Sequence, residues 1–147
     1  VAFDRLTKIK WYRCSAGQVL VENKCKGESL KLTWLEAQSF AREFSESSGE
    51  KWKVAQYWQL RELQRDDCIN PALDTRVFPN LEIGHYWSRD EHIFSERMSC
   101  SVYTFKGQGF CWQRKTAELP FMLVSDENAE RIKFLGRVQR VLIDFFN

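Results

Sequence analysis

Five cysteines constrain the fold of this 147-residue chain more than any other feature of its sequence. No two of them form a C-x-x-C pair, and only two histidines could add imidazole ligands, so a structural zinc site is poorly supported. Five cysteines in a small domain with six tryptophans predict an oxidising compartment, with two disulfides and one remaining thiol. Five reduced and mostly buried cysteines in a cytosolic protein are the alternative. The cysteines are Cys14, Cys25, Cys68, Cys100 and Cys111.

Length and composition fit one globular domain. Hydrophobic residues make up 44% and aromatic residues 14% of the chain, too many for a disordered protein. No apolar stretch approaches the ~20 residues that cross a bilayer, so we expect no membrane insertion. The formal net charge of +2 is too balanced to make nucleic acid the default partner. Because the chain begins with Val1, we expect a removed leader or a fragment of a longer protein.

The N-terminal residues indicate short strands. Residues 1–11 alternate loosely between apolar and charged side chains, which is typical of an edge strand with a turn. Residues 19–21 read as a short strand between turn residues. Cys14 and Cys25 flank this small hairpin, and we expect a disulfide between them to close it.

Two helices are predicted next. Thr33 and Glu36 form a capping box, and the apolar residues that follow recur at helical spacing until the Ser-Ser-Gly sequence at 47–49 ends the helix. A second helix is expected over residues 56–64. Its Leu60 and Leu63 should face inward.

The second half of the chain predicts further strands and a final helix. The expected elements are a loop at 66–84, a strand at 86–88, a hairpin of 101–105 and 110–112, a strand at 119–124 and a helix at 125–147. This order of elements predicts an α+β fold with a mostly antiparallel sheet.

The predicted hairpin also restricts which cysteines can form the second disulfide. If it turns at residues 106–109, Cys111 opposes Thr104 instead of Cys100, and the offset along the strands is too long for a direct bond. Cys68, in the preceding loop, is therefore the expected partner of Cys100 or Cys111.

Catalytic patterns are scarce in this sequence. It has no glycine-rich phosphate loop and no G-x-S-x-G elbow. The acidic pairs at 66–67 and 90–91 could bind a cation, but adjacent acids in loops are usually solvated. We therefore expect no bound metal, no cofactor and no enzymatic activity.

A series of short motifs runs in order between residues 4 and 124. The first, at 4–18, is D-R-L-T-K-I-K-W-Y-R-C-S-A-G-Q, and the others include T-W-x-x-A at 33–37, N-P-A-L at 70–73 and Y-W-S at 86–88. Together they resemble the Lcl C-terminal domain family, a bacterial family long described only as a domain of unknown function. Two departures stand out: Lys8 replaces a turn glycine, and Ala55-Gln56 replaces a Pro-Thr helix entry.

The resemblance implies a compact C-type-lectin-like fold for residues 1–124. The amphipathic helix predicted at 125–147 lies beyond the usual end of the family. Some family members bind sulfated glycans and act as trimeric adhesins, and the family motifs carry no catalytic residues. The E-P-N and W-N-D signatures of calcium-dependent lectins are absent, since residues 87–90 are W-S-R-D. Sugar binding of that calcium-dependent type is therefore not expected.

These observations predict a non-enzymatic recognition or adhesion module of a bacterial surface or secreted protein, located outside the cell, at its surface or in the periplasm. Cations beside aromatic rings suit a sulfated or acidic glycan. The alternatives are a solvated basic rim, a protein-protein interaction or assembly module, and a cysteine-using oxidase with a lectin-like fold. The candidate ligand-binding residues are Trp87, Arg89, His92, Arg97, Lys106, Trp112, Arg114 and Lys115.

The C-terminal segment adds an expectation about assembly. Its apolar residues Leu135, Val138, Leu142 and Phe145 follow the 3-4-3 spacing of a short coiled-coil seam. A homo-oligomer can bury this seam, and we favour a trimer because trimeric adhesins occur in the family that the chain resembles. Packing of the helix on its own domain is the alternative.

Overall fold

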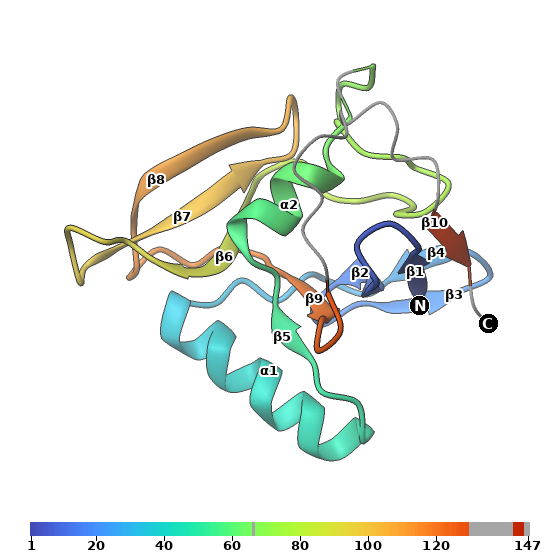
Figure 1. The fold of residues 1–147 in the computed structure, drawn as a ribbon, viewed down its shortest axis with the longest axis horizontal. Coiled ribbons are helices and arrows are strands. Elements are labelled where there is room, and N and C mark those ends of the chain that lie inside the picture. Colours follow the sequence, from blue (N-terminus) through green and yellow to red (C-terminus); the bar gives the residue numbers. More distant parts are fainter. Residues whose placement is uncertain (66, 130–142, 146–147) are drawn as a thin grey trace.

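The computed structural model describes residues 1–65, 67–129 and 143–145 (Figure 1). Within these ranges the chain forms an α+β fold of two helices and mostly antiparallel sheets, as the sequence predicts. The elements are β1 (Ala2–Asp4), β2 (Ile9–Ser15), β3 (Val19–Val21), β4 (Lys24–Lys26), α1 (Trp34–Ser48), β5 (Lys53–Val54), α2 (Tyr57–Leu63), β6 (His85–Glu91), β7 (Met98–Tyr103), β8 (Gln108–Arg114), β9 (Met122–Ser125) and β10 (Ile143–Phe145).

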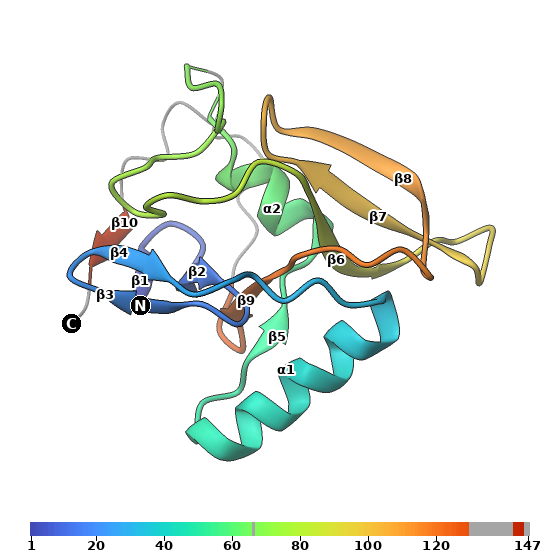
Figure 2. The same ribbon diagram turned by 180° about the vertical axis from the view of Figure 1, so that it is seen from behind.

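The strands form a five-stranded sheet in the order β10-β1-β2-β9-β5, a three-stranded sheet in the order β6-β7-β8, and the β3-β4 hairpin. All ladders within these sheets are antiparallel. Figures 1 and 2 show β6–β8 at one end of the molecule and the β1–β4 region at the other, with α1 along one side. A parallel bridge between Trp87 and Phe121 links the two larger sheets.

Two hydrophobic clusters fill the space between these elements. The first joins the five-stranded sheet to α2 and the three-stranded sheet, and includes Trp11, Leu60 and Tyr86. The second joins α1 to β5, β6 and β9, and includes Trp34, Trp52 and Trp87. Trp11, Trp34 and Trp52 are all buried in these clusters.

Helix α1 follows the sequence closely. The Thr33 hydroxyl accepts a hydrogen bond from Glu36 N at 3.4 Å, and the Glu36 carboxylate accepts one from Thr33 N at 3.0 Å, which completes the predicted capping box. At the other end Gly49 has a φ of 79° and donates its N–H to Ser45 O. This left-handed glycine cap ends the helix where the sequence predicts.

Helix α2 begins without the Pro-Thr entry that the family resemblance implies. Instead, the Gln59 side-chain oxygen accepts a hydrogen bond from Gln56 N at 2.7 Å, so one backbone donor at the start of the helix is satisfied from within the helix. Leu60 and Leu63 are buried, as predicted. A glutamine in the third helical position therefore takes over part of the capping role.

The two ends of the chain meet in the five-stranded sheet, which corrects two expectations. Residues 1–11 do not form an edge strand, because β10 pairs with the outer side of β1. The predicted C-terminal helix is wrong at Ile143–Phe145, which form that strand. The rest of its coiled-coil seam, at residues 135–142, lies outside the described residues.

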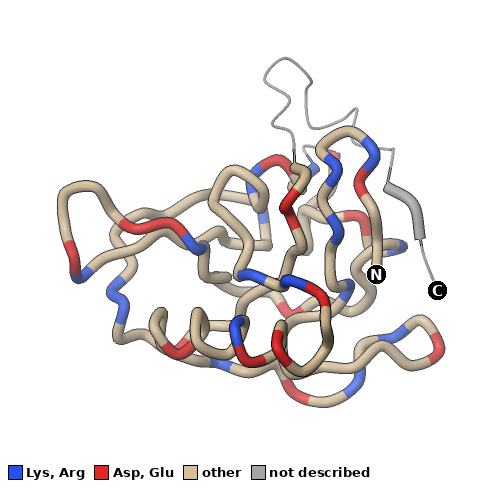
Figure 3. Tube along the Cα trace, turned by 60° about the horizontal axis from the view of Figure 1, so that its bottom comes forward, with Lys and Arg blue, Asp and Glu red and all other residues tan. Residues whose placement is uncertain are grey.

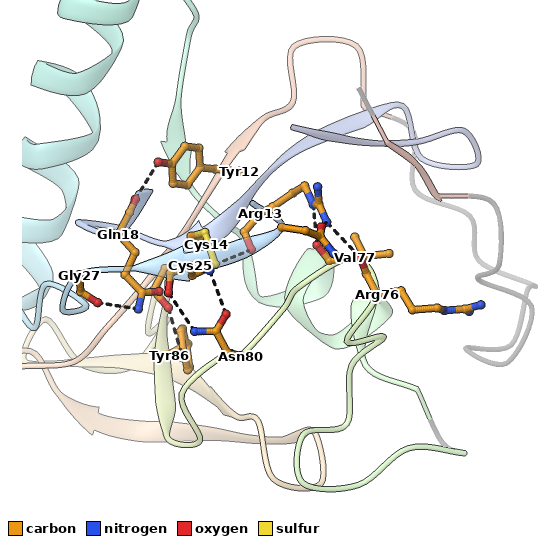
Figure 4. Close-up of a disulfide and its surroundings, with 12 residues drawn as sticks. Tyr12, Arg13, Cys14, Gln18, Cys25, Gly27, Arg76, Val77, Asn80 and Tyr86 are labelled. Atoms are coloured by element: carbon orange, nitrogen blue, oxygen red, sulfur yellow. Dashed lines mark hydrogen bonds between the residues drawn. A yellow bond between two sulfur atoms is a disulfide. The ribbon is translucent and has the colours of Figure 1, made fainter. Parts of the chain in front are cut away.

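The first disulfide joins Cys14 in β2 to Cys25 in β4, as predicted, and it lies beside the long loop at residues 67–84 (Figure 4). Asn80 in this loop accepts a hydrogen bond from Cys25 N at 2.9 Å and donates one to Cys25 O at 3.0 Å. Arg13 donates to Val77 O at 2.8 Å. The disulfide-bonded strands therefore hold the loop in place through the Asn80 side chain and the Val77 carbonyl.

The second disulfide joins Cys100 to Cys111, and Cys68 is free, so the predicted pairing of Cys68 is wrong. The error lies in the hairpin register. Tyr103 pairs with Gln108 and Ser101 with Phe110, which places the turn at residues 104–107 and brings the two cysteines opposite each other.

The position of this turn depends on two glycines with different roles. Gly107 has a φ of 81° in the turn, and a Cβ there would lie 2.8 Å from the Gln64 Cβ beyond α2. Gly109 lies within β8, where the Tyr57 ring of α2 packs against its backbone. The sequence alone does not distinguish the turn glycine from the packing glycine.

Peptide mapping without reduction is expected to recover Cys14 with Cys25 and Cys100 with Cys111, and alkylation before reduction should label Cys68. Each bridge closes a short loop, so replacing both Cys100 and Cys111 by Ser should lower the free energy of unfolding by about 2–3 kcal/mol in urea titrations. A peptide that links Cys68 to either of these cysteines would contradict the assignment.

The close approach of Tyr57 makes Gly109 a sensitive position. A Cβ at Gly109 would lie 1.9 Å from the Tyr57 hydroxyl oxygen, so Gly109→Ala must push the ring and α2 away from the sheet. We expect a loss of about 1–3 kcal/mol in the free energy of unfolding, measured by urea denaturation. Gly84→Ala is the matched control, because a Cβ there meets nothing within 4 Å. Equal stability of the two variants would refute this packing.

Candidate ligand-binding surface

The exposed face of β8 carries aromatic and cationic side chains. β8 lies at the edge of the three-stranded sheet, and its residues alternate between exposed and half-buried positions. Because successive strand residues point to opposite sides of a sheet, Phe110, Trp112 and Arg114 share one face. Trp112 is 61% exposed. An indole face and a guanidinium are thus available side by side.

The loop between β6 and β7, residues 92–97, approaches this face. The ring of His92 lies 4.6 Å from that of Trp112, centroid to centroid, and Phe94 lies 6.0 Å from His92. The loop bends back on itself, since His92 Nδ1 accepts a hydrogen bond from Phe94 N at 3.0 Å. His92 and Trp112, two of the predicted binding residues, are therefore in direct contact.

A hollow of about 440 Å³ beside Trp112 contains three of the predicted cations. Arg114 lies opposite Met98 in the β7-β8 ladder, and Lys115 N donates a hydrogen bond to Arg97 O at 2.9 Å, which fixes the two walls of the hollow. The side chains of Arg97 and Arg114 make no hydrogen bond or ion pair with the other described residues. The lining residues are Arg97, Met98, Arg114, Lys115 and Thr116.

Lys115 connects this hollow to the first helix. Its ammonium nitrogen lies 4.2 Å from the centre of the Trp34 ring, a cation–π distance. Its carbonyl accepts a hydrogen bond from Trp34 N at 3.0 Å, at the start of α1. The start of α1 and the end of β8 therefore support the cationic hollow.

Trp87 does not belong to this surface, which corrects its prediction as a ligand-binding residue. Its side chain is fully buried in the cluster beneath α1, and its indole N–H donates to Leu32 O at 2.9 Å. The adjacent residues Tyr86 and Trp87 pack into the two different hydrophobic clusters, so this part of β6 is covered on both faces.

Arg89 has a structural partner. Its guanidinium lies 2.7 Å from the Asp126 carboxylate, and Gln59 donates a second hydrogen bond to the same carboxylate at 2.8 Å. Burial alone would raise the pKa of Asp126, but the hydrogen bonds from Arg89 and Gln59 outweigh it and hold the pKa below its usual value. This ion pair joins β6 and α2 to the end of β9 and leaves Arg89 out of the cationic hollow.

Lys106 is exposed in the β7-β8 turn, at the opposite end of the hairpin from Arg97 and Arg114. Six residues of β8 separate the turn from the hollow, about 20 Å at the rise of an extended strand. The structure therefore assembles five of the eight predicted residues, namely His92, Arg97, Trp112, Arg114 and Lys115, and separates the other three.

Sequence reasoning missed three side chains of this surface. Ile93 and Phe94, in the loop after His92, are 86% and 83% exposed, and Phe110 precedes Trp112 on the same face of β8. Their signal was weak, because single apolar residues between charged ones also occur in buried strands. Phe110 extends the surface toward His85, whose ring lies 6.0 Å away and whose pKa is lowered by burial.

Charges of both signs are interspersed along the described chain (Figure 3). One residue of each acidic pair has a partner within the fold: Asp67 accepts a hydrogen bond from Arg65 at 2.7 Å, and Asp90 accepts one from Tyr57 N at 3.3 Å. No group of three or more potential metal-binding side chains is found among the described residues. In the same part of the chain, no helix is long and apolar enough to cross a membrane.

The free thiol of Cys68 shows no sign of activation. Burial, and then the neighbouring Asp67, raise the pKa of Cys68 above its usual value. Since the thiolate is the reactive form, a raised pKa disfavours a nucleophilic role.

The sequence model of the Lcl C-terminal domain family matches residues 1–125 of the chain. The chain belongs to this family. No curated protein and no solved structure matches the chain. Membership in the Lcl C-terminal domain family indicates a module of a surface or secreted protein, and the two disulfides are consistent with an oxidising environment.

The Arg89–Asp126 pair of this Lcl C-terminal domain predicts a pH-dependent stability. Arg89→Met leaves the Asp126 carboxylate buried without its cation and should lower the free energy of unfolding at pH 7 by about 2 kcal/mol. Because the pKa of Asp126 is depressed in the folded protein, its contribution is present above the usual value of 3.8 and is lost as the pH falls below it. The difference in the free energy of unfolding between the variant and the wild type should therefore become smaller toward pH 3.

Urea titrations at pH 7 and pH 3 measure this difference. Arg97→Met is the control, since Arg97 is exposed and has no side-chain partner among the described residues, and it should be neutral at both pH values. If Arg89→Met lowers the free energy of unfolding by the same amount at pH 7 and pH 3, the ionised Asp126 carboxylate is not the cause.

Proposed function

We propose that the domain is a non-enzymatic recognition module of a bacterial surface or secreted protein, and that it binds acidic glycans at the exposed end of the three-stranded sheet. The observation that carries the proposal is the contact of Trp112 with His92 next to the hollow lined by Arg97 and Arg114. An aromatic face stacks on a sugar ring, while guanidinium groups form charge-assisted hydrogen bonds to sulfate or carboxylate.

Three features of the surface support binding over a solvated rim. Arg97 and Arg114 are not used by ion pairs of the described fold, so their charge remains available to a ligand. Trp112 exposes most of a large ring that the core does not need. Trp112 and Arg114 stand on β8, which the Cys100–Cys111 disulfide joins to β7, so little conformational entropy is lost on binding.

The wider proposal follows from the same surface and from the family. We propose a C-type-lectin-like architecture, an extracellular, surface or periplasmic location, and a homo-oligomer in which several copies of the surface increase avidity. A cysteine-using oxidase would need two free cysteines near each other. Four of the five cysteines are bridged, and Cys68 has a raised pKa, so this alternative is disfavoured.

Heparin serves as a probe for the proposed site. Trp112→Ala and Arg114→Ala should each weaken binding of the intact chain to a heparin surface by about tenfold, because each removes one stacking or charge-assisted contact. Lys106→Ala removes the same charge at the far end of the hairpin and should bind like the wild type. Affinities are measured by surface plasmon resonance at fixed salt, and unchanged thermal unfolding shows that the variants are folded.

Two results would contradict the proposal. One is elution of the wild type from heparin no later than a charge-matched control protein. The other is equal loss of affinity in the Arg114 and Lys106 variants, which would show that binding follows net charge and not the Trp112 surface.

A further inference from the structure

The loop at residues 92–97 projects from one end of the molecule. In Figures 1 and 2 it forms the outermost point of the three-stranded sheet, beyond β6 and β7, and no other described segment lies over it. At its tip Ile93 and Phe94 are 86% and 83% exposed. Two adjacent large apolar side chains are thus held in solvent at the most prominent point of this region.

This exposure is not explained by the fold. Phe94 touches the ring of His92, and neither Ile93 nor Phe94 belongs to a hydrophobic cluster of the described core. Adjacent residues point in different directions, so the two side chains form an apolar protrusion and not a flat patch. A protrusion that is apolar on more than one side fits a medium that can surround it.

The tip adjoins aromatic and cationic side chains. Phe94 lies beside His92, whose ring contacts Trp112, and Trp is typical of the boundary between lipid and water. Arg97, at the end of the same loop, and Arg114 line the hollow, and their guanidinium groups make no hydrogen bond or ion pair with the other described residues. Guanidinium groups bind phosphate well.

We propose that this loop docks the domain on a phospholipid surface, with Ile93 and Phe94 entering the acyl boundary and Arg97 and Arg114 binding headgroup phosphates. Exposed apolar side chains, aromatic rings and guanidinium groups meet at this end of the sheet, and these residue types respectively insert into a bilayer, lie at its boundary and bind headgroup phosphates. A protein groove would need to enclose the tip on several sides, whereas acyl chains can surround it without a preformed shape.

The acidic residues of the loop limit the strength of this contact. Glu91 and Glu96 are exposed beside the tip and offset part of the positive charge of Arg97, Arg114 and Lys115. Binding of one domain should therefore be weak, reversible and only moderately dependent on anionic lipid. Several copies in an oligomer would strengthen it by avidity.

This inference concerns insertion of a loop and not of a spanning segment. The expectation of no membrane insertion rested on the lack of a long apolar stretch, and a two-residue tip gives no such signal. The lipid proposal shares Arg97 and Arg114 with the proposed glycan site, but it can be tested separately, because Ile93 and Phe94 are not required for the contacts that Trp112 and Arg114 would make with a sugar.

Sedimentation of the intact chain with vesicles tests the proposal. We expect binding to mixed phosphatidylcholine and phosphatidylglycerol vesicles that exceeds binding to phosphatidylcholine alone. Ile93→Asp and Phe94→Asp should each weaken it by about tenfold or more, since each replaces a buried apolar contact with a charge. Leu35→Asp is the matched control, because Leu35 is equally apolar and 68% exposed, but lies on α1.

A second measurement reports the depth of the tip. A Phe94→Trp variant should lose fluorescence on binding vesicles whose lipids carry bromine on the acyl chains, beyond the quenching seen for the wild type. This readout depends on contact between residue 94 and acyl chains, which a merely electrostatic association would not give.

The outcomes separate the two proposals. Absence of vesicle binding, equal loss in the Leu35 and Phe94 variants, or no additional quenching of Phe94→Trp would each overturn the lipid proposal. Loss of heparin binding with unchanged vesicle binding in Phe94→Asp would assign the tip to the glycan site instead. Vesicle binding through the tip without any heparin binding would leave the lipid proposal standing and refute the glycan proposal.

Discussion

The burial of Trp87 holds the two larger sheets of this domain together. Its backbone N–H donates to Pro120 O at 3.0 Å, its indole N–H donates to Leu32 O at 2.9 Å, and its ring fills the cluster between α1 and β9. One residue of β6 thus reaches the strand that leads into β9 and the segment that leads into α1. The anchoring of β6 therefore supports the three-stranded sheet whose edge strand, β8, carries the exposed surface.

The same three-stranded sheet is fixed from its other side by α2. Tyr57 packs on the backbone of Gly109 and Gln64 packs on the turn at Gly107, so the helix sets both the position of the turn and the separation of β8 from the core. The resulting register brings Cys100 opposite Cys111, and their disulfide joins β7 to the edge strand. Packing, register and covalent closure therefore lead to one arrangement of Phe110, Trp112 and Arg114.

The sequence predicted those parts of the fold that depend on neighbouring residues. The capping box of Thr33, the hairpin closed by Cys14 and Cys25, and the inward face of α2 are all set within about a dozen residues, and the structure confirms them. The family resemblance, carried by motifs in order, is confirmed as well.

The predictions that failed depend on contacts between distant segments. Which of the two glycines turns the second hairpin is decided by α2, about 40 residues earlier in the chain, and the wrong choice led to the wrong partner for Cys100. The burial of Trp87 is decided by its bridge to Phe121. The strand at Ile143–Phe145 is decided by pairing with the first residues of the chain. Periodicity within a short window contains none of this information.

The candidate surface likewise combines features that neighbouring residues predict with features that depend on distant contacts. Trp112 and the cations near it were predicted from residue type, but their grouping into one hollow follows from the backbone contact between Lys115 and Arg97. The sequence did not predict the tip at Ile93 and Phe94, because the exposure of these residues is visible only in the folded loop.

The fold buries Trp87 completely but leaves Phe94 in solvent, so the core does not use the apolar side chains at the tip. Those side chains lie near the guanidinium groups of Arg97 and Arg114, which form no ion pair with the other described residues, on a sheet that is fixed by a disulfide and by two buried packing contacts. Rigid support beneath exposed and chemically mixed groups is the arrangement expected of a binding surface, since ordering the groups in advance lowers the cost of binding.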